Sequence, residues 1–158
     1  MGDGPSEMIM LMTGLIVAGL VSAVLLSTWD TISDGLENQG ELEVQDAKTR
    51  ASLISDPSLI SWDNTADRAF IYVQNSGTIS LNIDDTYVFL DGNPMTVTAV
   101  DAGGVTWSKG VAIKFQIDAN TDLTFTDGTE CFLTVGVSSL STSPTGTYSL
   151  TEVVRLDI

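Results

Sequence analysis

The sequence predicts a long N-terminal hydrophobic α-helix followed by an all-β, Ig-like sandwich of about seven antiparallel strands. Three observations support this fold class. The stretch from 8 to 26 contains no charged residue. From Leu42 onward, apolar and polar residues alternate with the period of two that is typical of half-buried strands. Short segments rich in Gly, Pro, Asn, Asp and Ser interrupt this alternation, as turns do between short strands.

The first predicted element is a helix that stays in the membrane. At about 1.5 Å per residue, the stretch 8–26 would just span a hydrocarbon core of about 30 Å. Residues 5–7 suit a helix start, and residues 38–40 supply a stop. The alternative is a cleaved signal peptide, which usually begins with basic residues, whereas this N-terminus carries Asp3 and Glu7. We therefore expect a retained membrane anchor.

The remaining elements are strands, and they define a second domain. We expect an assembly helix at 1–41 and an extracytoplasmic β-domain at 42–158, with the chain crossing the cell membrane once. The sequence says little about which end of the helix faces the cytoplasm, because Lys and Arg residues usually mark that side and none precedes Lys48. The candidate strands are 43–54, 68–74, 86–90, 95–100, 111–117, 130–137 and 147–157.

Charge and composition exclude several classes of function. The 21 acidic and 6 basic residues give a net charge of −15, so we expect no binding to nucleic acid. The chain has no histidine, which removes the commonest catalytic base, and we expect no enzymatic activity and no catalytic residue. We also expect no cofactor and no metal, since the turn aspartates lack the ligand spacing of a calcium loop. The single cysteine, Cys131, sits in an apolar alternation and is predicted to be a buried core residue.

Two rows of small residues run along the apolar stretch, with members four positions apart. In lipid no hydrophobic force joins helices, so small residues favour association by letting two backbones approach closely. We therefore expect this helix to pack against helices of other subunits, although small residues are common in membrane helices generally. The first row is Gly14, Ala18 and Ser22, and the second is Gly19, Ala23 and Ser27.

Four further residues complete the candidate assembly surface. Glu7 lies at the rim of the apolar stretch, where it is either a solvated flank or the partner of a neighbouring subunit's N-terminal amine. Trp29, Ile32 and Leu36 continue one apolar stripe beyond the membrane. This stripe needs a partner, which is either the chain's own β-domain or a neighbouring helix. Trp29 is also compatible with a simple anchor at the lipid headgroups.

Four short motifs follow one another along the β-domain, and their order and spacing resemble those of a known family. They are Ser-Asp-Pro at 55–57, Ala-Phe-Ile-Tyr-Val-Gln-Asn-Ser-Gly at 69–77, Val-Phe-Leu-Asp-Gly at 88–92 and Thr-Trp-Ser-Lys-Gly at 106–110. Together with the N-terminal helix, this pattern resembles the archaellum stator protein G (FlaG-type) family, within the archaellin and archaeal type IV pilin-like superfamily. The resemblance covers nearly the whole chain.

The resemblance implies a structural role in the archaeal motility machinery, the archaellum. It implies a stator protein that polymerises through its N-terminal helix and anchors the motor to the cell envelope. The implied partners are copies of itself, a related stator protein, the surface-layer protein and, through 8–26, the membrane. One alternative is an archaellin or type IV pilin-like filament subunit for motility or adhesion. We expect the stator protein because residues 1–4 lack the basic leader usual in filament subunits. Another alternative is a monomeric membrane-tethered binding module.

Overall fold

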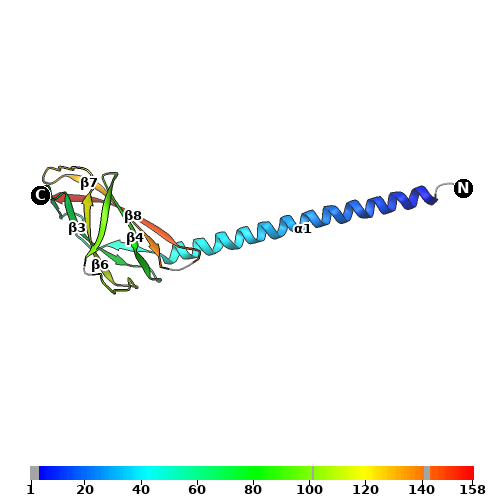
Figure 1. The fold of residues 1–158 in the computed structure, drawn as a ribbon, viewed down its shortest axis with the longest axis horizontal. Coiled ribbons are helices and arrows are strands. Elements are labelled where there is room, and N and C mark those ends of the chain that lie inside the picture. Colours follow the sequence, from blue (N-terminus) through cyan, green and yellow to red (C-terminus); the bar gives the residue numbers. More distant parts are fainter. Residues whose placement is uncertain (1–3, 101, 141–142) are drawn as a thin grey trace. The chain divides into compact units, whose positions relative to one another are not determined.

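A computed structural model describes residues 4–100, 102–140 and 143–158 of the chain (Figure 1). It contains two compact units, one up to Gly40 and the other from Glu41 onward. In the described residues the chain forms one helix, α1 (Gly4–Lys48), and then eight strands.

The helix α1 is 45 residues long, and none of its described residues is buried. Among the described residues it is the one helix that is long and apolar enough to cross a membrane. It ends at Lys48, so the predicted stop at 38–40 is wrong and residues 43–48 of the predicted first strand are helical. The reason is local: one glycine costs a helix only about 1 kcal/mol, and the following Glu, Leu, Gln, Ala and Lys residues are strong helix formers.

Seven of the eight strands overlap the predicted segments, but the first is shorter than the predicted 43–54 and the one predicted at 86–90 begins at Leu81. Their bounds are β1 (Ala51–Leu53), β2 (Ile60–Asp63), β3 (Arg68–Asn75), β4 (Leu81–Leu90), β5 (Asn93–Val100), β6 (Ala112–Ala119), β7 (Glu130–Ser139) and β8 (Thr147–Asp157). The sequence missed β2, because four residues are too few to show a period of two clearly.

The strands close into a seven-stranded barrel rather than the predicted Ig-like sandwich. Around the ring the order is β3, β2, β8, β7, β4, β5 and β6, and β6 pairs again with β3. The strand that the sequence missed closes the ring, because β2 pairs with β3 on one side and with β8 on the other. The pairing of β2 with β8 is parallel, with Ile60 opposite Leu156, whereas the other strand pairs described are antiparallel.

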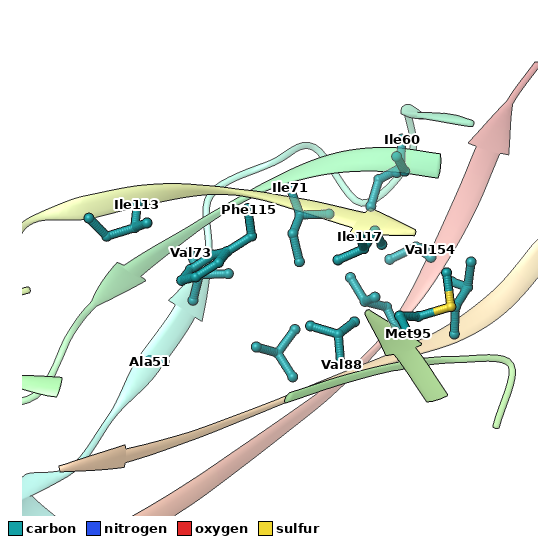
Figure 2. Packing of buried hydrophobic residues seen from close by; sticks show 14 of the residues in the cluster. Ala51, Ile60, Ile71, Val73, Val88, Met95, Ile113, Phe115, Ile117 and Val154 are labelled. Atoms are coloured by element: carbon teal, nitrogen blue, oxygen red, sulfur yellow. The ribbon is translucent and has the colours of Figure 1, made fainter. Parts of the chain in front are cut away.

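The hydrophobic core fills the inside of the barrel. Alternate residues point inward from each strand, as in Ile71 and Val73 of β3 and Phe115 of β6. Figure 2 shows these side chains gathered with Val88 of β4 and other apolar residues in one interior. Cys131 is buried in this core, which confirms its predicted role.

Candidate assembly surface and helix seat

The predicted assembly residues all lie exposed along α1. The first row of small residues forms the floor of a shallow groove whose walls are larger apolar side chains. The residues lining this groove are Ile9, Met10, Thr13, Gly14, Val17, Ala18, Val21 and Ser22. A Cβ atom added at Gly14 or Gly19 would meet nothing within 4 Å, so the space over both glycines is open to another helix.

Helix geometry joins this groove to the apolar stripe that follows it. At about 100° per residue, Gly14 and Ala18 point in the same direction as Ile32 and Leu36, within a sector of about 80°. Glu7, Ser22 and Trp29 fall in the same sector. The structure therefore brings seven of the ten candidate residues onto one continuous face of α1.

The second row of small residues lies on a different side of α1. Gly19 and Ala23 point about 140° away from Gly14 and Ala18. Past the apolar stretch, that direction is occupied by carboxylates four or three positions apart: Asp30, Asp34, Glu37 and Glu41. From Gly14 to Leu36, one side of the helix thus carries apolar and small residues, whereas the opposite side turns acidic. The first row is therefore the better candidate for close packing with a neighbour.

Hydroxyl groups near the apolar stretch bond within α1 itself. Thr13 donates to the Ile9 carbonyl at 2.7 Å, and Thr28 donates to the Val24 carbonyl at 2.8 Å. These groups need no partner from another chain, which makes the stretch compatible with lipid.

The residues that hold the C-terminal turn of α1 on the barrel carry no pattern in the sequence that marks them as a group. Thr49 is fully buried and closes the helix by donating its backbone N–H (2.9 Å) and its hydroxyl (2.7 Å) to the Gln45 carbonyl. A side chain on Gly77 would overlap with the Lys48 carbonyl, and one on Gly146 would overlap with Thr49. We call the contact of residues 45–50 with these two glycines the helix seat.

Asn75 is the polar centre of the helix seat. It is fully buried, and its side-chain Nδ2 donates to the carbonyls of Ile79 (2.7 Å) and Trp107 (2.8 Å). Its Oδ1 accepts from the Gly77 N–H at 2.9 Å. Gly77 in turn donates to the Arg50 carbonyl at 3.0 Å. The Asn-Ser-Gly segment of the family motif is therefore a structural clamp as well as a turn.

Two titratable groups in the β-domain have displaced pKa values. Burial raises the pKa of the Cys131 thiol to about 11, with a smaller contribution from the Asp91 carboxylate. Hydrogen bonds from the hydroxyl and the backbone N–H of Ser58 lower the pKa of Asp56, which holds the exposed turn before β2. Within the described residues no three Cys, Asp or Glu side chains gather as metal ligands would.

Comparisons with known proteins show which family and which relatives this chain is similar to. A family model described as archaeal-type flagellin matches residues 3–155. A flagella-related protein G from Methanococcus voltae is 30% identical over 95 residues, which are 59% of this chain and 63% of that protein. The chain thus spans less than two thirds of the length of this curated relative.

Among solved structures, the secreted serine protease VesC from Vibrio cholerae matches 73% of this chain and 24% of its own. Its TM-score is 0.35 at 12% identity, and a likeness this weak carries no argument about fold or function.

The family model spans the helix and nearly all of the barrel, and the protein G relative confirms the resemblance inferred from the four motifs. The chain therefore belongs to the archaeal-type flagellin family.

Proposed function

We propose that this chain is a stator protein of the archaellum, which polymerises through α1 and anchors the motor to the cell envelope. The observation that carries the proposal is the continuous apolar face of α1, on which no described residue is buried. Apolar side chains on this scale need lipid or other helices around them. The similarity to a flagella-related protein G supports a role in the apparatus, and the resemblance to the stator protein G family favours the stator among such roles.

The proposal assigns each unit of the chain a separate task. Residues 8–26 lie in the cell membrane, and the apolar stripe at Trp29, Ile32 and Leu36 extends the contact between neighbouring helices beyond the lipid. The β-domain lies outside the membrane, where it meets the envelope partners: a related stator protein and the surface-layer protein. This role is structural and needs no catalytic group.

A leucine at Gly14 tests assembly through the first row. We expect Gly14→Leu to fill the groove, because the leucine side chain would keep the backbone of a second helix from approaching closely. The full-length variant should run as monomers in detergent under conditions where the unchanged protein forms oligomers, as measured by light scattering and electron microscopy.

The matched control is Gly35→Leu, the same substitution on the same helix. A side chain there also meets nothing within 4 Å, and Gly35 lies outside both rows. It should leave the oligomers intact. Gly19→Leu tests in the same way whether the second row contributes to oligomer formation. Normal oligomers in both Gly14→Leu and Gly19→Leu would refute assembly through small residues.

A filament subunit is the second candidate, and the family description, archaeal-type flagellin, favours it. The abundance of this chain in filaments distinguishes a stator protein from a filament subunit. Filaments sheared from cells should contain this chain as a minor component or not at all if it is a stator protein. If it is their main component, the chain is a filament subunit.

A further inference from the structure

The outer surface of β4, β7 and β8 carries a group of exposed apolar side chains. Tyr87 is 48% exposed, Phe89 36%, Phe132 58% and Val153 54%. They alternate with core residues of the same strands, so they point away from the barrel interior. Strand register joins them, with Phe132 directly opposite Val153. We call these four residues the aromatic face.

The rings of the aromatic face are held in place. Tyr87 and Phe89 lie with ring centroids 5.9 Å apart and planes inclined at 73°, a favourable arrangement for two aromatic rings. The ring of Tyr87 passes over Gly136 of β7, where any side chain would overlap with it. A surface fixed in this way loses little conformational freedom when a partner binds.

Elsewhere on the barrel, the chain's own cations cover the exposed ring of Phe70 and the half-buried ring of Tyr148. The Lys114 ammonium lies 4.3 Å from the centre of the Phe70 ring, and the Arg50 guanidinium lies 5.0 Å from that of Tyr148. Within the described residues no cation covers a ring of the aromatic face. These rings are therefore open to a cation from another molecule.

Carboxylates flank the most exposed of these rings. The Asp91 N–H donates to the Phe132 carbonyl at 2.8 Å, which places Asp91 beside Phe132. Glu130 lies two positions before Phe132 and is also exposed. In the part of the chain that the structure describes, neither carboxylate forms an ion pair. The basic neighbour of this group is Arg155, opposite Glu130 on β8.

We propose that the aromatic face binds a segment of another protein that presents Arg or Lys beside apolar side chains. The cation would lie between the ring of Phe132 and the carboxylates of Asp91 and Glu130, where both attract it. A second copy of this chain fits poorly, because its own Asp91 and Glu130 would meet like charges. The inference rests on the proposed function, since it names the kind of partner that the β-domain meets.

A photo-cross-linker tests the proposal in the intact protein. The full-length chain, carrying p-benzoylphenylalanine at position 132, is expressed in its native envelope and irradiated. The matched control carries the same group at position 70, an exposed aromatic position that Lys114 covers. We expect about fivefold more cross-linked product at 132, joined to a peptide of a different protein with Arg or Lys close to the cross-link.

Removing the two charges is the second arm. Asp91→Asn together with Glu130→Gln should lower the yield at position 132 about threefold or more. Asparagine tolerates the positive φ of 50° at position 91, and glutamine keeps the shape of the glutamate, so the barrel should fold normally by circular dichroism.

Any of four results would overturn the proposal: a cross-link to another copy of this chain, a cross-link to lipid, a yield no higher than at position 70, or a yield unchanged in the amide variant. The helix experiment keeps the two ideas separate. If Gly14→Leu still breaks the oligomers while the cross-link fails, the aromatic face is not the docking surface and the stator proposal stands.

Discussion

Asn75 illustrates what a single residue reveals in a sequence and what it hides. The sequence marks it as part of a turn motif after a strand, and the structure confirms that β3 ends there. Its bond to Ile79 is local, but its burial and its bond to Trp107, 32 positions further on, depend on a distant segment of the chain. Such contacts depend on tertiary packing, so no local pattern could predict them.

Cys131 gives a prediction at the same scale. Burial raises the pKa of its thiol to about 11, so at pH 8 only about one molecule in a thousand carries the reactive thiolate. We expect alkylation by iodoacetamide to be about a hundredfold slower in the native protein than in urea. Mass spectrometry of timed samples measures both rates.

The same displaced pKa has a consequence for stability. Below the ordinary pKa of about 9 the thiol is protonated in both the folded and the unfolded chain. As the pH rises from about 9 towards 11, the unfolded chain loses the proton first, so the folded state loses stability. Equal alkylation rates in native and unfolded protein would show that Cys131 is not shielded.

Among the elements, the C-terminal turn of α1 depends on two glycines for its place on the barrel. We expect Gly77→Ala to destabilise the β-domain by about 1–3 kcal/mol, because the new methyl group overlaps with the Lys48 carbonyl and forces the backbone apart. Urea unfolding of the full-length protein, followed by tryptophan fluorescence, measures the change, since Trp62 and Trp107 are buried in the barrel.

Gly35→Ala is the control for this substitution. The added methyl group is free of contacts there, and alanine favours a helix over glycine by about 1 kcal/mol. The barrel should unfold at the same urea concentration as in the unchanged protein. If Gly77→Ala also leaves the urea concentration of unfolding unchanged, the contacts of the helix seat are looser than the structure indicates.

The elements that the sequence predicted best are the long strands. The segment 147–157 coincides with β8, and 68–74 falls within β3, because each carries enough residues to show its alternation. The prediction failed at the helix end and at β2. At 43–48 strong helix formers outweighed a glycine, which is a local effect. The strand β2 has only four residues, so its pairing partners rather than its local pattern decided its place.

At the scale of the whole molecule, the net charge of −15 sets how the chain responds to salt. Like charges oppose folding, and salt screens them, since the Debye length falls from about 30 Å at 0.01 M to about 8 Å at 0.15 M. We expect the melting temperature to rise by about 5 °C between these concentrations of NaCl. Differential scanning calorimetry of the full-length protein measures it.

Potassium chloride serves as the control for this prediction. Screening depends on ionic strength alone, so KCl should raise the melting temperature as much as NaCl does. A melting temperature that does not change with either salt would mean that the carboxylates are too far apart to repel one another.

The two candidate surfaces differ in how far the sequence could predict them. All seven residues of the α1 face follow from helical spacing, which the sequence contains in full. The aromatic face draws on β4, β7 and β8, and its residues become neighbours only through strand register. Without the pairing of Phe132 with Val153, nothing in the sequence connects them.

The closed ring of strands has a consequence for the proposed assembly, in which many copies of the β-domain would lie close together. Open sheet edges invite backbone pairing with neighbours, which leads to aggregation that is difficult to reverse. In the described residues, β2 links β3 to β8 and so occupies the place where such an edge would begin. Apart from the short strand β1, which lies outside the ring, neighbouring domains in the proposed assembly would therefore meet through side chains, and such contacts can form and separate.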